Sequence, residues 1–227
     1  MGAPADLSLL LDRVARLAGA AGQDGRRRVL GVAGPPGAGK TTLVEALLAA
    51  AAADRRLTGR LAHVPMDGFH LSNAALEELD LRGRKGAPDT FDTASYAAVL
   101  AAVRDSPRRV VTAPAFDHAV GEPTVDALVV PVAADVVVTE GNYLLLDEPA
   151  WQPVRATLDE VWFCALADEV RRARLVQRHV AAGRDPHDAK AWVERSDEAN
   201  ARLVSATAAR ADLALLDGRV LGGSAAP

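Results

Sequence analysis

The sequence predicts an α/β fold in which a parallel β-sheet lies between two layers of helices. Short apolar, β-branched segments alternate with amphipathic helical segments along the chain, which is typical of such a sheet. A glycine-rich turn, "GPPGAGKTT", follows one of these strands and opens a long helix. The chain of 227 residues, 49% of them hydrophobic, has room for one large domain with a sizeable core.

The expected elements follow in chain order. Leucines and a valine recur at helical spacing between residues 7 and 17, so the first helix, within residues 1–24, should lay one face on the domain. The expected strands are residues 29–34, 60–66, 134–141, 160–166 and 211–217, with a hairpin from 108–118 and 125–132. The expected helices are residues 40–53, 72–81 (opened by a Ser or Asn cap), 93–104, 168–183 and 186–210, and the tail 222–227 should be frayed.

Composition restricts the partners and the compartment. Twenty-six basic against 30 acidic residues give a net charge of −4, which argues against a general nucleic-acid binder. The single cysteine, Cys164, stands in the apolar run "VWFCAL" and has no second cysteine to pair with, so we expect a reducing, cytoplasmic location. Acids and arginines interrupt the apolar pattern of residues 1–20, so no signal peptide or membrane span is expected.

The turn "GPPGAGKTT" fits the Walker A spacing G-x-x-x-x-G-K-[ST]. Its glycines let backbone N–H groups point at phosphate oxygens, and the helix N-terminus adds partial positive charge. Lys40 can bridge the outer phosphates of ATP, and the Thr41 hydroxyl can ligate Mg²⁺. We therefore predict a three-layer P-loop NTPase fold. The expected nucleotide-binding residues are Gly34, Gly37, Ala38, Gly39, Lys40, Thr41 and Thr42.

Two acids follow other expected strands. In a parallel sheet ligands gather at the carboxyl ends of the strands, so Asp67 and Glu140 should lie near the phosphate site. Asp67 can accept a proton from an attacking hydroxyl, or it can simply cap a turn. Glu140 can hold a magnesium-bound water, or it can merely end its strand. His70 can bond a substrate, although a lone histidine in a turn is often only polar.

Six segments in order resemble the P-loop kinases that include uridine kinase, type I pantothenate kinase and phosphoribulokinase. The likeness is greatest to the branch called nucleoside/nucleotide kinases or fructose-transport-associated kinases. The segments are "GPPGAGKTT", "PMDGFHLSNAAL", "RKGAPDTFD", "PAFDHAVGEP", "VVVTEGNYLLLD" and "RLVQRHVAAG". The resemblance implies a single P-loop kinase domain over residues 1–227, with an acceptor-site region at about 80–130, a helical lid and following helix at about 168–200, and a possible homodimer.

The resemblance also implies roles for particular residues. Asp67 matches the family's catalytic base, and Glu140 with Thr41 matches the magnesium site. Residues of the acceptor site would be His70, Arg84, Lys85, Asp92, Phe116, His118 and Tyr143. Phe116 stands where relatives tend to carry Tyr, so one hydrogen bond to the substrate would be missing. From the residues alone, a solvated basic loop for 84–92 and core packing for Tyr143 remain alternatives.

Arginines at three- and four-residue spacing share one face of the expected helix 168–183. The resemblance makes this helix the lid, with Arg174 and Arg178 neutralising charge on the transferring phosphoryl group; the alternative is a solvated face paired with acids. The roles of Arg171, Arg184, Asp197 and Asn200 stay open, and for the last two a surface helix is the simpler interpretation.

The leading hypothesis is an enzyme that moves the γ-phosphate of ATP, with Mg²⁺, to a hydroxyl of a small metabolite. A nucleoside, a sugar or a pantothenate-like polyol would be such an acceptor. The alternative is a regulatory or transport-coupled P-loop NTPase that hydrolyses its nucleotide. Hydrolysis needs no acceptor pocket, so the segments around Asp67, 84–92 and 114–118 favour the kinase.

Overall fold

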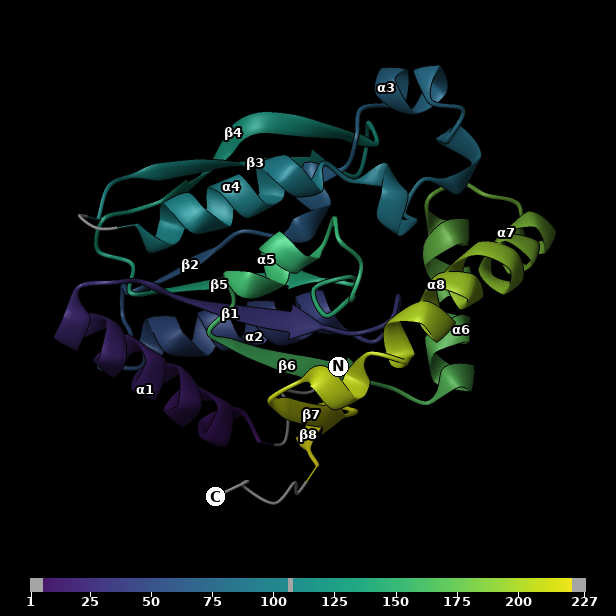
Figure 1. Ribbon diagram of the computed structural model, residues 1–227. Helices are drawn as coiled ribbons and strands as arrows, with labels where there is room; N and C mark the ends of the chain where they lie inside the picture. Colours follow the sequence, from purple (N-terminus) through teal and green to yellow (C-terminus); the bar gives the residue numbers. More distant parts are fainter. Residues whose placement is uncertain (1–5, 106–107, 222–227) are drawn as a thin grey trace.

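Parallel strand pairing organises the central sheet of the computed structural model, which describes residues 6–105 and 108–221. The strand order is β2-β5-β1-β6-β7-β8, and every pairing is parallel except that of β7 with β8 (Figure 1). The strands are β1 (Arg28–Ala33), β2 (Leu61–His63), β5 (Val136–Gly141), β6 (Glu160–Ala165), β7 (Leu213–Leu216) and β8 (Arg219–Val220). The predicted parallel α/β sheet is confirmed.

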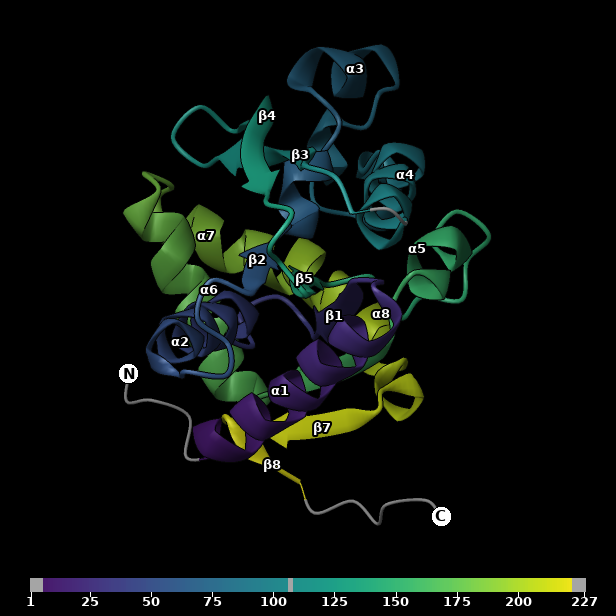
Figure 2. The ribbon, with the colours of Figure 1, turned by 90° about the vertical axis from the view of Figure 1, so that its left-hand side faces the viewer.

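Helices cover both faces of this sheet. The helices are α1 (Leu7–Asp24), α2 (Lys40–Ala53), α3 (Asn73–Glu78), α4 (Thr93–Arg104), α5 (Gln152–Ala156), α6 (Asp168–Ala181), α7 (Pro186–Trp192) and α8 (Glu198–Ser205). Figure 2 shows α2 and α5 on opposite sides of the strands. Because successive side chains of a strand point to opposite faces, β1 sends Leu30 and Val32 to a core shared with α1 and α2, and Val29 and Ala33 to a core shared with α4 and α5.

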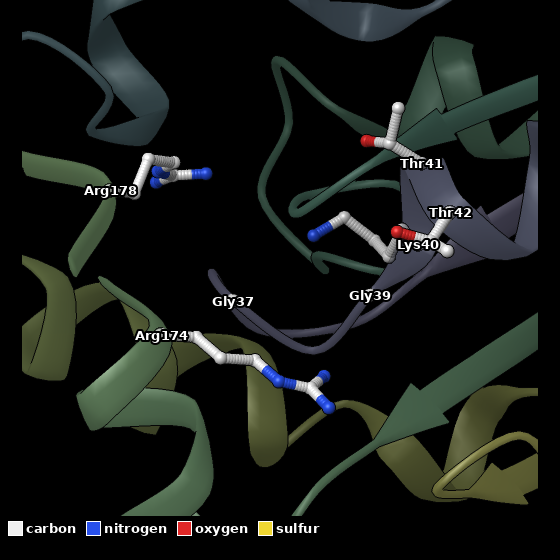
Figure 3. Close-up of a pocket in the computed structure, with 7 residues that line it drawn as sticks. All are labelled: Gly37, Gly39, Lys40, Thr41, Thr42, Arg174 and Arg178. Carbon is white, nitrogen blue, oxygen red and sulfur yellow. The ribbon is translucent and has the colours of Figure 1, made fainter. Parts of the chain in front are cut away.

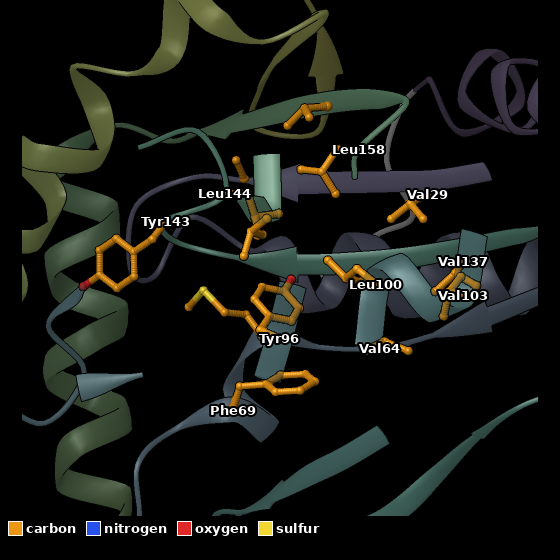
Figure 4. Close-up of a cluster of buried hydrophobic side chains, with 14 of the residues drawn as sticks. Val29, Val64, Phe69, Tyr96, Leu100, Val103, Val137, Tyr143, Leu144 and Leu158 are labelled. Atoms are coloured by element: carbon orange, nitrogen blue, oxygen red, sulfur yellow. The ribbon is translucent and has the colours of Figure 1, made fainter. Parts of the chain in front are cut away.

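The second of these cores is the larger one, and it lies beside the site (Figure 4). It holds Tyr96 and Leu100 from α4 together with Tyr143 and Leu144 from the segment after β5, all of them fully or almost fully buried. The Tyr96 hydroxyl is hydrogen-bonded to Thr139, which satisfies its polar atom inside the core.

A separate antiparallel hairpin forms from β3 (Val111–Asp117) and β4 (Glu122–Val130), as predicted. It packs against a 3₁₀ turn, Met66–Phe69, that follows β2. The approach is close, because a Cβ added at Gly68 would stand 2.2 Å from the Pro114 carbonyl oxygen. The hairpin therefore packs against the turn that carries Asp67.

Several boundaries differ from the expectations. Strand β2 ends at His63, because Pro65 has no N–H to continue the ladder. The expected helix 186–210 is divided by a π-helical turn, Val193–Asp197. Ser72 is the cap of α3 and accepts a hydrogen bond from the Ala75 N–H. Helix α5 and strand β8 were not expected, and the tail 222–227 lies outside the described residues. In the described part of the chain, no helix combines the length and the apolar character that a membrane span requires.

Candidate active site

The phosphate loop, residues 34–42, connects β1 to α2 and has a backbone that glycine alone accommodates at key points. Gly37 and Gly39 have φ angles of 79° and 92°, a region that L-residues other than glycine rarely adopt. A Cβ at Gly34 would also stand 2.4 Å from the Cys164 carbonyl oxygen. The glycine-rich turn predicted from the sequence is thus present, and it packs against β6.

This loop and helix α6, the expected lid, line a cavity of about 260 Å³. Its lining residues are Gly37, Gly39, Lys40, Thr41, Thr42, Arg174 and Arg178, all of them predicted from the sequence as nucleotide or catalytic residues. Figure 3 shows both arginine side chains extending from α6 toward the phosphate loop. Three cationic side chains, those of Lys40, Arg174 and Arg178, line the same space beside the N-terminus of α2, which suits a polyphosphate.

Lys40 is buried at the start of α2 and donates to neutral acceptors. Its Nζ lies 2.7 Å from Asn142 Oδ1 and 3.2 Å from the Pro35 carbonyl oxygen. Burial lowers the pKa of Lys40, while the charges of Glu140 and Asp67 oppose that effect. The charge of Asp67 therefore favours the protonated form of this lysine.

Thr41 and Glu140 meet at the floor of the site. The Thr41 hydroxyl donates to Glu140 Oε1 at 2.8 Å, and Glu140 is only 8% exposed. Burial raises the pKa of Glu140, and Lys40 together with the Thr41 hydrogen bond only partly offsets this. A hydroxyl beside a buried carboxylate short of positive charge is an oxygen donor set that fits Mg²⁺.

Asp67 lies in the 3₁₀ turn rather than at the tip of β2. The turn begins after Pro65 without a side-chain cap, and His70 Nδ1 contacts the backbone carbonyl of Asp67 at 2.8 Å. Among the described residues, the Asp67 carboxylate accepts no hydrogen bond, so the capping alternative is not what this structure shows. The half-buried carboxylate is left available to a ligand.

Aromatic and imidazole rings stand next to Asp67. The His70 ring lies between Phe91 and Phe116, with centroids 4.1 and 4.6 Å away, and His118 meets the edge of Phe116 at 5.1 Å. Burial lowers the pKa of His70, although the Asp67 carboxylate opposes this. The structure therefore brings His70, Phe116 and His118 together beside Asp67.

The other predicted acceptor residues have local partners. Lys85 Nζ lies 2.6 Å from both Asn73 Oδ1 and the Gly121 carbonyl oxygen, and it stands 5.3 Å from the Phe116 ring centre. Arg84 pairs with Asp89 at 3.0 Å in an exposed position. Asp92 caps α4 through Ser95. Tyr143 is fully buried, so its ring packs in the core and does not line a site surface.

The lid arginines divide into two groups. Arg174 and Arg178 line the cavity, whereas Arg171 is 1% exposed and pairs with Glu198 and Asp168. Arg171 also donates to the Pro36 carbonyl oxygen of the phosphate loop at 3.4 Å. Arg171 is therefore a structural residue that fixes α6 against the loop.

The structure also places residues whose roles the sequence leaves open. Arg184 stacks on Trp192 with its guanidinium 4.3 Å from the ring centre. Asp197 is buried and bonds His179 Nε2 at 2.8 Å, so the surface interpretation was wrong for Asp197. Asn142, the partner of Lys40, was missed; its place two residues after Glu140 in "EGNYLLLD" was the available signal.

Residues 29–220 match the sequence profile of the phosphoribulokinase/uridine kinase family. The chain belongs to this family. It is accordingly a P-loop kinase, an enzyme that uses ATP for phosphoryl transfer, and the resemblance inferred from the six segments is confirmed.

Individual relatives share much of the chain. A Schizosaccharomyces pombe protein, provisionally named as a uridine kinase, is 36% identical over 176 residues, which are 76% of this chain and 74% of the relative. The uncharacterized protein YggC of Escherichia coli is 36% identical over 188 residues, or 83% and 77%. A Silicibacter sp. TM1040 structure, described provisionally as a fructose transport system kinase, superposes with a TM-score of 0.77 at 33% identity and covers 90% of this chain and 98% of its own.

Proposed function

We propose that this kinase transfers the γ-phosphate of ATP to a hydroxyl of a small metabolite, with Asp67 as the general base. The observation that carries the proposal is the position of Asp67. Its carboxylate is unpaired among the described residues, acts electrostatically on Lys40, and stands beside the ring cluster of His70 and Phe116. A base in that place would accept the proton of a hydroxyl bound near the ring cluster and directed at the phosphate site.

The ring cluster supports a polar mode of acceptor recognition. A backbone carbonyl only accepts, so His70 Nδ1 carries the proton toward Asp67 O and leaves Nε2 as an acceptor. His70 and Lys85 both lie against the Phe116 ring, and Phe69, Phe91 and Tyr143 are buried. These contacts leave little free aromatic surface for a flat base, which favours a sugar or polyol over a nucleoside.

Thr41 and Glu140 would hold Mg²⁺, directly or through water. When bound, the ion would neutralise negative charge on the nucleotide phosphates. Side chains of the protein would supply the other two contributions, charge stabilisation and proton acceptance. Lys40, Arg174 and Arg178 point donors into the cavity, where they would stabilise the charge that develops on the phosphoryl group. The acceptor proton would pass to a carboxylate oxygen of Asp67.

The experiment is an ADP-release assay with Mg·ATP against a panel of sugars, polyols, nucleosides and pantothenate. One acceptor should stimulate ADP release, and Asp67→Asn should abolish the stimulation while a non-hydrolysable ATP analogue still binds. Asp105→Asn is the matched control, because Asp105 is an exposed carboxylate that follows α4 and pairs with Arg109. It should retain the acceptor-stimulated rate.

Equal ADP release with and without every acceptor would contradict the proposal. If Asp67→Asn also kept that rate, the protein would be a nucleotide hydrolase, and Asp67 would have no part in its chemistry. Loss of analogue binding in Asp67→Asn would instead assign the residue to the nucleotide site.

A further inference from the structure

The turn between β3 and β4 is hydrogen-bonded to residues that lie 36 and 49 positions earlier in the chain. Lys85 Nζ donates to the Gly121 carbonyl oxygen and to Asn73 Oδ1, each at 2.6 Å. Asn73 completes the arrangement, because its backbone N–H donates to Glu122 Oε1 at 2.9 Å. Asn73, Lys85, Gly121 and Glu122 are called here the clasp.

The clasp holds a part of the chain that has little burial of its own. Figure 1 shows α3 at the end of the molecule where the β3–β4 turn lies, away from the central sheet. Leu76 is the buried side chain of α3, and residues 77–84 are exposed apart from the half-buried Leu81. Because few apolar contacts fix this segment, the polar contacts of Asn73 and Lys85 on either side of it matter more for its position.

Lys85 is suited to join the three segments. Its ammonium has three N–H donors, and two of them serve the oxygen atoms of α3 and of the turn. Hydrogen bonds from a charged donor are stronger than those between neutral groups. Lys85 Nζ also stands 5.3 Å from the centre of the Phe116 ring, so the same ammonium contacts the hairpin at a second point.

The clasp reaches the ring cluster beside Asp67 through the hairpin. His118 lies within the turn, and Phe116 precedes it in β3. The Phe116 ring centre lies 4.6 Å from that of His70, and His118 meets the edge of the Phe116 ring at 5.1 Å. A displacement of the turn would therefore shift both rings relative to His70.

We propose that Lys85 is a positioning residue, which together with Asn73 holds the β3–β4 turn in place. The turn then keeps Phe116 and His118 beside Asp67. This inference rests on the proposed function, because the site that it shapes is that of the acceptor, and it replaces the direct substrate contact that the resemblance implied for Lys85. None of the four clasp residues lines the nucleotide cavity, so loss of the clasp would weaken acceptor binding and leave nucleotide binding intact.

The first test is hydrogen–deuterium exchange of residues 73–79 and 117–122 in the free protein. Lys85→Met keeps an unbranched side chain and removes the donors, whereas Asn73→Ala removes the Oδ1 acceptor and leaves the lysine charge. Each should speed exchange of both segments about tenfold or more, the effect of losing a hydrogen bond from a charged group. The double variant should exchange more slowly than the product of the two single effects, because both substitutions remove the same bond.

The second test is the KM for a compound that stimulates ADP release. Lys85→Met and Asn73→Ala should raise this KM alike, about tenfold, because the rings that shape the site are misplaced. Their kcat should change far less, and the non-hydrolysable ATP analogue should bind as in the unaltered protein. A raised KM in Lys85→Met with a normal KM in Asn73→Ala would overturn the proposal, since Lys85 would then contact the acceptor itself.

Arg82→Met is the matched control. It removes an exposed cation of the same segment, which pairs with Glu77 at 3.6 Å and lies outside the clasp. It should keep the exchange rates and the KM of the unaltered protein.

Two exchange results would also overturn the clasp: unaltered rates in both single variants, or fully multiplicative effects in the double variant. The exchange experiment needs neither nucleotide nor acceptor. If no compound stimulated ADP release, the proposed function would be contradicted, and exchange would still decide whether the clasp exists.

Discussion

Lys40 Nζ lies 2.7 Å from Asn142 Oδ1, so the lysine of the phosphate loop donates to a neutral amide. Glu140, the acid that most opposes the lowering of the Lys40 pKa, instead accepts a hydrogen bond from Thr41. The positive charge of Lys40 is therefore buried without a directly bonded carboxylate. Such a charge is costly until an anion arrives, and nucleotide phosphates supply that anion.

Nucleotide affinity should consequently fall with rising pH, and the fall should begin at a lower pH than for an ordinary lysine. Burial lowers the pKa of Lys40 from 10.5, and only the protonated amine attracts phosphate. Affinity is full below the lowered pKa and is lost as the pH rises through it. Calorimetric titration of the non-hydrolysable analogue between pH 7 and 10 measures this loss. Lys40→Arg stays charged, so its affinity should be flat; the same slope in both proteins would contradict the assignment.

Replacing Glu140 should separate metal dependence from nucleotide binding. Burial raises the pKa of Glu140 above 4.5, and protonation competes with Mg²⁺, so magnesium-dependent activity should be lost on acidification at a higher pH than for an ordinary glutamate. Glu140→Gln should weaken the apparent Mg²⁺ affinity about tenfold or more, measured by magnesium titration of activity. Binding of the analogue without metal should persist. Glu45→Gln, an exposed neighbour on α2, should retain the normal magnesium requirement.

Substitutions of two arginines that lie one turn apart on α6 should have different effects. Arg171 is buried against Glu198, so Arg171→Met leaves this mostly buried carboxylate with only the more exposed Arg172, at 3.5 Å, as a partner among the described residues and should lower the free energy of unfolding by about 3 kcal/mol. The Tm should fall by roughly 10 °C. Arg174→Met removes a cavity donor and should lower turnover about 100-fold with the Tm unchanged. A normal Tm for Arg171→Met would show that its ion pairs contribute little.

The fold and the phosphate site were predictable because both have strong local patterns. Apolar periodicity marked the strands, and the spacing of "GPPGAGKTT" placed Lys40 and Thr41 together. The π-helical turn at Val193–Asp197 was not predictable, because the sequence pattern of residues 186–210 indicates one continuous helix. His179 approaches from α6 and is the hydrogen-bond partner of the buried Asp197 side chain.

The acceptor region was harder to predict, because its side chains have their partners in distant segments. Tyr143 stands in an apolar run that suits a pocket wall as well as a core. Its hydroxyl donates to the Gly86 carbonyl, which lies 57 residues earlier in the chain. Lys85 is likewise held by Asn73 and Gly121, which no local pattern indicates.

Gly68 should be required for transfer because β3 leaves no space for a side chain. A Cβ there would meet the Pro114 carbonyl oxygen at 2.2 Å, so Gly68→Ala must displace the turn that carries Asp67. Acceptor-stimulated transfer should fall about 100-fold while affinity for the ATP analogue is unchanged. Gly83→Ala is the control, since a Cβ there meets nothing within 4 Å. Equal rates for both variants would exclude a tight fit at Gly68.

His63 on β2 should make the protein less stable in mild acid. Burial lowers its pKa from 6.5 to about 4, and within the described residues its Nε2 has no hydrogen-bond partner. Between those values the unfolded chain binds the proton and the folded protein does not, so the free energy of unfolding falls as the pH drops from 6.5 toward 4. The loss attributable to His63 should be of order 2 kcal/mol.

Urea unfolding at pH 7.5 and at pH 5 measures that loss. His63→Leu removes the proton-binding group, so its free energy of unfolding should fall less between the two pH values than that of the unaltered protein. His187 is the control, because its side chain is 92% exposed. His187→Leu should keep the full acid sensitivity. If His63→Leu keeps it too, carboxylates elsewhere cause the acid destabilisation, and the buried imidazole has no share in it.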